Sequence, residues 1–230
     1  MKKITLIGAV LGLAALNQGH ADVIALKANI DYWQYNADMN HPQQIPTNSE
    51  LDDDHSLAFS AAFEHPIPFL PNAKIKHTNL KADSQESSDG IHRNQLDLDY
   101  TDFILYYEIL DNLVNLDAGF GLKRLDGNIR RNYMAVQDLS GNLPMFYAQG
   151  GVKLPFTGLS ANAEVSVAAL SDDRITDAQI DLKYNFVETA LVDIGAKAGY
   201  RILEMQIDRD ADTETKFKFK GPYLGIDAHF

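Results

Sequence analysis

Cysteine is absent from the whole chain of 230 residues. The protein therefore forms no disulfide, and any metal site built on thiolate ligands is excluded. Basic residues are also scarce, because 20 lysines and arginines stand against 32 aspartates and glutamates, which gives a net charge of −12. A chain of this charge repels nucleic acid, and no basic stripe offsets the repulsion, so we do not expect binding to DNA or RNA.

Long apolar runs are missing as well. After residue 21, no apolar run approaches the ~18–20 residues that a membrane-spanning helix requires. The first residues, MKK, are basic, residues 4–16 are apolar or small, and Gly-His-Ala follows shortly afterwards. This order is typical of a secretory signal peptide. We expect residues 1–21 to be removed by cleavage between Ala21 and Asp22, leaving one domain over residues 22–230; the alternative, a retained anchor, has too few apolar residues to span a bilayer.

The sequence also lacks the local motifs of common enzymes. It contains no Gly-x-Ser-x-Gly elbow, no His-Glu-x-x-His pair and no phosphate-binding loop. We therefore predict no cofactor, no metal site and no catalytic residue.

What the sequence does contain is apolar residues that alternate with polar ones about ten times. In VNLDAGFGLK, for example, Val114, Leu116 and Phe120 fall on one face while Asp117 and Lys123 fall on the other. Helical spacing at three and four residues fits these segments less well. The predicted strands cover residues 23–36, 55–65, 73–82, 94–109, 113–125, 145–155, 159–170, 175–186, 191–207 and 213–230.

The connections between these segments alternate between short ones and generally longer, more polar ones. That asymmetry is typical of bacterial outer-membrane barrels, which have short periplasmic turns and longer external loops. The predicted fold class is all-β: an antiparallel up-and-down transmembrane β-barrel of about ten strands, with eight strands as the alternative. A soluble sandwich would also alternate, but strands of 10 to 16 residues exceed its usual 5–6 and match the ~9–11 residues that cross a bilayer.

Aromatic residues near the strand ends are expected to form girdles at the two membrane interfaces. The residues assigned to these girdles are Tyr32, Phe69, Tyr106, Tyr107, Phe146, Phe156, Phe186, Phe217, Phe219 and Phe230.

The chain ends with YLGIDAHF, in which Ile226, Ala228 and Phe230 alternate with polar residues. A terminal Phe after alternating apolar residues resembles the assembly signal of outer-membrane barrels. Together with the stretches EHPIPFLPN, YTDFILYYEILDNLVNLDAGFGLKRLDG, LPFTGLS and GPYLGIDAHF, it resembles a family of small proteobacterial outer-membrane barrels of unassigned activity. The resemblance implies the fold and a location in the outer membrane, and it carries no catalytic or ligand-binding residues.

The predicted lumen is narrow and polar. A barrel of about ten strands is little wider than one of eight, whose own side chains fill its interior. We expect inward lysines and acids to pair across strands, because an unpaired buried charge is unfavourable. The residues expected to do so are Lys27 with Asp31, Asp117 with Lys123 and Asp193 with Lys197. A narrow selective pore lined by the same residues is the alternative.

Three features of the predicted outer rim could carry chemistry. Carboxylates beside an imidazole in LDDDH (residues 51–55) could activate water, although a solvated acidic loop explains them better. His77 and His92 are candidates, by position only, for a lipid-modifying site. Arg130 and Arg131 could hold lipid phosphates. The single tryptophan, Trp33, is expected to point inward near the rim as a packing residue.

These observations favour an exported outer-membrane barrel with a structural or surface-interaction role. The alternatives are an outer-membrane hydrolase, a lipid-modifying enzyme or a narrow selective channel. The expected partners are outer-membrane lipid and lipopolysaccharide, with periplasmic chaperones and the barrel-insertion machinery acting during assembly.

Overall fold

We describe the fold from a computed structural model of the chain. The residues described are 24–40, 48–50, 54–83, 94–131, 134–189, 192–208 and 214–230. Within these ranges, no helix is long and apolar enough to cross a membrane.

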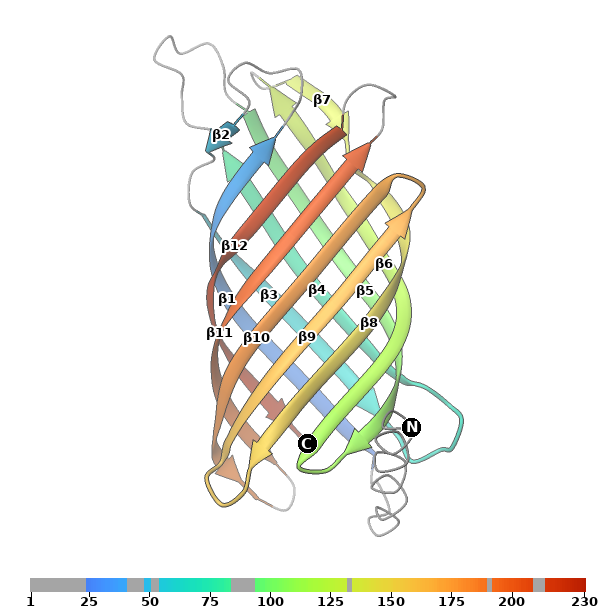
Figure 1. Cartoon of the computed structure of the whole chain (residues 1–230), viewed down its shortest axis with the longest axis vertical. Helices are drawn as coiled ribbons and strands as arrows, with labels where there is room; N and C mark the ends of the chain where they lie inside the picture. Colours follow the sequence, from blue (N-terminus) through green and yellow to red (C-terminus); the bar gives the residue numbers. More distant parts are fainter. Residues whose placement is uncertain are drawn as a thin grey trace, which may run out of the picture.

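Ten long antiparallel strands close into a barrel, as the alternation predicts (Figure 1). Each strand pairs with the long strand before and after it, and the last pairs with the first, from Lys27 opposite His229 to Asn40 opposite Lys216. The long strands are β1 (Ala25–Asn40), β3 (Asp54–Glu64), β4 (Asn72–Asp83), β5 (Asn94–Asp111), β6 (Val114–Arg131), β8 (Gly141–Leu154), β9 (Leu159–Leu170), β10 (Asp173–Glu188), β11 (Asp193–Asp208) and β12 (Glu214–His229).

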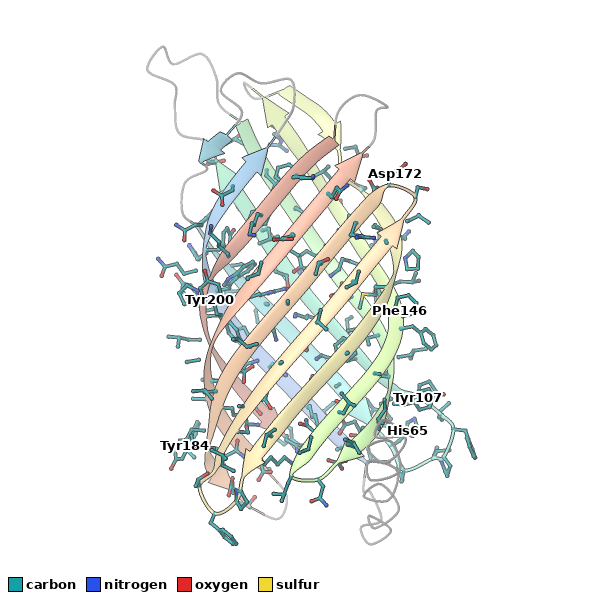
Figure 2. The ribbon with its side chains drawn as sticks, viewed as in Figure 1. His65, Tyr107, Phe146, Asp172, Tyr184 and Tyr200 are labelled. Atoms are coloured by element: carbon teal, nitrogen blue, oxygen red, sulfur yellow. The ribbon has the colours of Figure 1, made fainter. Side chains whose placement is uncertain are left out.

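The two ends of the barrel differ. At one end, called here the short-turn end, the connections are residues 65–71, 112–113, 155–158 and 189–192. The opposite end is called the long-loop end. It carries two further short strands, β2 (Asn48–Glu50) against β1 and β7 (Met134–Asp138) against β6. One hairpin at this end is tight, with Asp172 at its tip (Figure 2).

The outer wall carries a continuous apolar belt in the half of the barrel nearer the short-turn end. Figure 2 shows the rings of Tyr107, Phe146 and Tyr184 projecting away from the wall. The period-two pattern explains this belt, because every second residue of these segments is apolar and faces outward. Members of the belt that are well exposed include Leu26, Ile30, Phe59, Phe63, Ile75, Phe103, Leu116, Phe120, Leu122, Val152, Ile180, Leu182, Phe186, Leu224 and Ile226.

Nearer the long-loop end, the polarity of the wall is inverted, so that its outer face is charged and its inner face is apolar. The outward residues there are charged and exposed: Asp38, Lys81, Asp97, Arg124, Asp126, Arg174, Glu204 and Lys218. The inward residues at the same level are apolar and buried: Trp33, Tyr35, Leu80, Leu96, Leu98, Leu125, Leu143, Met145, Ile175, Leu203, Met205, Phe217 and Phe219. The expectation of a lumen that is polar throughout is therefore wrong for this half, which has an apolar interior of the kind found in water-soluble proteins.

The girdle assignment needs a related correction. Tyr106, Phe217 and Phe219 point inward and are almost fully buried. Period two explains Tyr106, because adjacent residues face opposite sides of the wall and its neighbour Tyr107 takes the outer one. Phe217 and Phe219 lie in the half where the pattern is inverted.

The belt covers only part of the height of the barrel. On β10 it runs from Phe186 to Ala178, eight residue steps, which at ~3.4 Å per residue and a tilt of ~40° is about 20 Å. This height is close to the ~25 Å band of known transmembrane barrels. By the same conversion the 18 residues of β5 rise about 45 Å. About half of the barrel therefore extends beyond the belt on the long-loop side.

The strands β5 and β6 come close together at two inward glycines. A Cβ atom added at Gly119 would overlap the carbonyl oxygen of Leu105, and one added at Gly121 would overlap that of Phe103. The contacting atoms belong to the backbone, so a side chain at either position cannot be accommodated by rotation of a neighbour.

We expect Gly119→Ala to destabilise the barrel by about 1–3 kcal/mol, the range for overpacking of a tightly packed site. Denaturant unfolding of the reconstituted protein measures this change. Ala118→Val is the matched control, because Ala118 faces outward on the same strand and the added methyl groups lie on the outer face of the wall. If both variants keep the wild-type stability, the close approach of β5 and β6 does not restrict the side chain that position 119 tolerates.

Candidate functional site

A layer of buried charged side chains crosses the lumen at mid-height. Its centre is Arg201 on β11, whose guanidinium donates to Asp177 on β10 through Nε (2.9 Å) and Nη2 (2.6 Å). Nη2 also donates to the hydroxyl of Tyr100, which in turn donates to Asp177 Oδ2 at 3.2 Å. The guanidinium lies over the ring of Trp33, 4.7 Å from its centroid. Arg201 is thus held by ion pairing, hydrogen bonding and a cation–π contact.

Two further ion-paired groups complete this charged layer. Lys76 contacts Glu164 at 2.7 Å and Asp177 at 3.7 Å, which links it to Arg201. Lys123 donates to both oxygens of Asp102, at 2.6 and 2.8 Å, and lies over the ring of Tyr100. These side chains come from seven strands, β1, β4, β5, β6, β9, β10 and β11. A network of this kind fixes how the strands face one another across the lumen, because a shift in register would separate the partners.

The predicted pairing of inward lysines with acids is confirmed for most of the named residues, but with other partners. Lys27 pairs with Glu64, Lys197 with Asp31, and Lys123 with Asp102. Asp117 and Asp193 have no ion pair within the described residues. Sequence spacing identifies which residues point inward, whereas the choice of partner depends on distances across the lumen that the sequence does not contain.

Beyond the charged layer, towards the long-loop end, the apolar interior closes the lumen. Trp33, Tyr35 and Phe219 lie in contact, with ring centroids 4.8 and 5.5 Å apart for successive pairs. The indole N–H of Trp33 donates to the carbonyl of Gly221 at 3.2 Å. The prediction that Trp33 points inward as a packing residue is confirmed. We call this part of the interior, the buried inward residues named above, the apolar plug.

Towards the short-turn end, the lumen contains a polar cavity of about 750 Å³. All ten long strands contribute to its lining, which reaches from Lys76 and Gln179 of the mid-height region to Thr157 and Gly158 at the short turns. The expectation that side chains fill the whole interior is therefore wrong at this end. Its lining includes the small inward residues Ser60, Ala62 and Ser160, which leave more room than the large apolar residues of the opposite half.

The acidic rim segment is described only in part. Asp52 and Asp53 lie outside the described residues. Asp54 and His55 begin β3, where Nδ1 of His55 lies 3.2 Å from Asp54 Oδ1 and the imidazole stacks on Tyr32. Among the described residues, no group of three His, Asp or Glu side chains could hold a metal ion.

His77 faces outward on β4, at the edge of the apolar belt, within a hydrogen-bonded chain. Its Nδ1 lies 2.9 Å from the hydroxyl of Thr101, and its Nε2 accepts from the amide of Asn79, which also donates to Asp99. Because Nε2 accepts, Nδ1 carries the proton and donates to Thr101. An imidazole in this state cannot take a proton from that hydroxyl, so the arrangement satisfies polar groups and does not activate a nucleophile.

The remaining sequence-predicted residues are placed as follows. Arg130 is exposed and bonds to Asn128, which leaves its predicted contact with lipid phosphates a prediction. Ile226 and Phe230 are exposed on the outer wall, and Ala228 is half-buried between them; their role as an assembly signal also stays a prediction. His92, Ala21 and Asp22 lie outside the described residues, as does the side chain of Arg131.

Comparison with known proteins identifies no family for this chain, and the solved structures that it resembles are only distantly similar. No protein-family model and no curated protein matches the sequence. Solved structures similar to this one include the outer-membrane protease OmpT from Escherichia coli, with 9% identity, a TM-score of 0.47 and coverage of 90% of this chain and 97% of that one. The β-domain of the Bordetella autotransporter BrkA has 12% identity, a TM-score of 0.43 and coverage of 91% and 99%. Neisserial surface protein A has 12% identity, a TM-score of 0.36 and coverage of 88% and 97%. All three are outer-membrane barrels, and at these values the likeness assigns no activity to this chain.

Proposed function

We propose that this chain is an integral outer-membrane barrel with a structural or surface-interaction role, and that its long-loop end faces the cell exterior. The observation that carries the proposal is the inversion of polarity along the wall: the outer face is apolar in the belt and charged nearer the long-loop end. An exposed apolar belt about 20 Å high would be unfavourable in water, but it is favourable in the hydrocarbon of a bilayer. The charged outer wall next to the belt suits a barrel that projects beyond the membrane into water.

The residues at both edges of the belt fit this placement. At the short-turn end, the loop of residues 65–71 extends sideways from the wall (Figure 1) and exposes Ile67, Phe69 and Leu70. The hydroxyl of Tyr107, on the belt, donates to the carbonyl of Phe69 at 3.0 Å and holds the loop near the wall. An apolar loop with an aromatic residue at this level would lie in the periplasmic leaflet at its boundary with water.

At the opposite edge, β12 presents a row of outward lysines, Lys216, Lys218 and Lys220. Lys218 contacts Glu204 at 2.6 Å and Lys220 contacts Asp38 at 3.5 Å, with all four side chains well exposed. Lysines just beyond the belt could bind the phosphate groups of lipopolysaccharide. This row supports lipopolysaccharide as a partner. The alternation in the sequence does not single it out, because lysines at every second position of a strand fit either face of the wall.

We also propose that the protein does not act as an enzyme. An outer-membrane hydrolase or lipid-modifying enzyme would need a base next to a nucleophile, and His77 donates to Thr101 instead of accepting from it. At the rim, His55 contacts Asp54 and stacks on Tyr32, and neither contact among the described residues supplies a nucleophile. Neither arrangement favours catalysis over the role proposed above.

A barrel closed by both the charged layer and the apolar plug should not conduct ions. We expect the purified protein to produce no stepwise conductance in planar lipid bilayers, whereas a 16-stranded porin reconstituted in parallel should conduct. Folding of the protein is confirmed by its heat-modifiable migration on gels and its incorporation by co-flotation with lipid, so that failed insertion is not mistaken for a closed barrel. Steady, ion-selective openings would contradict the sealed barrel and favour the narrow channel.

A further inference from the structure

The loop of residues 65–71, called here the proline loop, differs from an ordinary surface turn. Its sequence is HPIPFLP, with no lysine, arginine or acidic residue. It joins β3 to β4 and projects sideways from the wall (Figure 1). All five residues from Pro66 to Leu70 are exposed. A run of exposed apolar residues of this length is unfavourable in water and indicates a surface that contacts something apolar.

The conformation of Phe69 supports such a contact. Phe69 is 96% exposed, and its φ angle is 68°. This left-handed conformation is unfavourable for residues with a side chain, whereas glycine adopts it freely. In water, a glycine at position 69 would avoid both the strain and the exposed ring. The phenylalanine therefore indicates that its ring makes a favourable contact outside the chain.

The backbone of the proline loop has few N–H groups left for water. Three of its seven residues are prolines, which have no N–H. The amide of His65 donates to Asn72 Oδ1 at 3.1 Å. The amide of Ile67 donates to Nδ1 of His65 at 3.3 Å, and that of Leu70 to the carbonyl of Ile67 at 3.4 Å. Among the described residues, an acceptor is missing only for the amide of Phe69.

Two further hydrogen bonds attach the proline loop to its base, where His65 and Tyr107 lie next to the wall (Figure 2). Because Nδ1 of His65 accepts a hydrogen bond, its proton lies on Nε2, which donates to the carbonyl of Pro71 at 3.2 Å. The hydroxyl of Tyr107 donates to the carbonyl of Phe69. Irregular loops are normally excluded from hydrocarbon because their backbone polar groups lack partners. The prolines and these hydrogen bonds remove most of that obstacle.

The proline loop leaves the wall at the level of the belt. Asn72, which follows the loop, pairs with Tyr106, whereas β5 continues to Asp111 and exposes Ile109 on the way. The strands β3 and β4 therefore end where β5 still contributes apolar surface.

We propose that the proline loop inserts among phospholipid acyl chains, just inside the head groups of the leaflet next to the short-turn end. There it replaces the belt surface that β3 and β4 do not supply. Acyl chains are the occupant that suits its shape, because they are fluid and can surround a projection, whereas a folded partner would need a matching groove. The inference rests on the proposed function, which places the belt in a membrane.

Spin labelling tests the proposal directly, because the chain has no cysteine of its own. Phe69→Cys is labelled with a nitroxide and folded into phosphatidylcholine vesicles. Collisions with oxygen, which concentrates in hydrocarbon, are compared with collisions with a water-soluble nickel chelate. We expect the oxygen-to-nickel ratio at residue 69 to be several times that of Asn112→Cys, the matched control in the exposed turn of residues 112–113 at the same end. Heat-modifiable migration confirms that each labelled variant folds.

Leu182→Cys, labelled in the belt on β10, separates the two proposals. Nickel access at residue 69 equal to that at Asn112, with Leu182 shielded, would place the loop in water and overturn the inference alone. Nickel access at Leu182 as well would overturn the membrane assignment and the inference with it. Low access of both reagents at residue 69, or spectral broadening that disappears on dilution with unlabelled protein, would also overturn the inference, because the loop would then contact protein.

Discussion

Replacing Arg201 by methionine is expected to lower the free energy of unfolding by about 3 kcal/mol or more. Methionine keeps the unbranched apolar stem of arginine but is shorter, so the substitution removes the charge, the hydrogen bonds and the packing of the guanidinium over Trp33. Among the residues that the structure describes, it leaves the buried Asp177 with Lys76, 3.7 Å away, as its remaining ion-pair partner. Breaking a buried ion pair from one side typically costs about 3–5 kcal/mol, because the remaining charge stays buried and uncompensated. Urea unfolding in lipid vesicles, followed by circular dichroism, measures the change.

Two further variants separate this explanation from a general loss of stability. In Arg201→Met combined with Asp177→Leu, no carboxylate is left without its partner, so much of the lost stability should return. Lys218→Met removes a lysine from the exposed pair with Glu204, which has a similar contact distance of 2.6 Å. Exposed pairs contribute about 0–1 kcal/mol. Equal effects of Arg201→Met and Lys218→Met would show that burial of the charged layer does not determine its strength.

Much of the fold could be predicted from local pattern. The alternation of Val114, Leu116 and Phe120 with Asp117 and Lys123 identifies both a strand and the face of each residue. The physical reason is that period two is a property of the strand itself and requires no knowledge of its neighbours. For the same reason the inward orientation of Trp33 could be predicted.

The charged layer and the inversion of the wall could not be predicted in this way. Arg201 and Asp177 are 24 residues apart, on adjacent strands, but Arg201 and Trp33 meet only because the first and last parts of the chain close the barrel. The inversion does have a signal in the sequence: on β12 the outward positions change from Leu224 and Ile226 to Lys218 and Lys220. Alternation alone does not reveal it, because a strand that crosses from lipid to water keeps its period while the two faces exchange polarity.

The belt itself can be tested by placing an arginine at two levels of one strand. Leu182 lies in the belt on β10, two-thirds exposed, with Ala161 and Ala198 as its paired neighbours. We expect Leu182→Arg to destabilise the protein in lipid vesicles by about 2–4 kcal/mol, as for arginine near the centre of a bilayer.

Thr176→Arg is the matched control, because Thr176 faces outward on the same strand, six residues nearer the long-loop end, next to the native charges of Arg174 and Glu204. Near an interface the same change costs about 0–1 kcal/mol. A large difference between the two variants requires that the surroundings of the wall change from hydrocarbon to water between positions 182 and 176. A soluble barrel would not produce it, because arginine at either outward position would reach water equally well. Equal stability of the two variants would therefore contradict the proposal that the belt lies in a membrane. The closed barrel and its buried ion pairs would not be affected by that result.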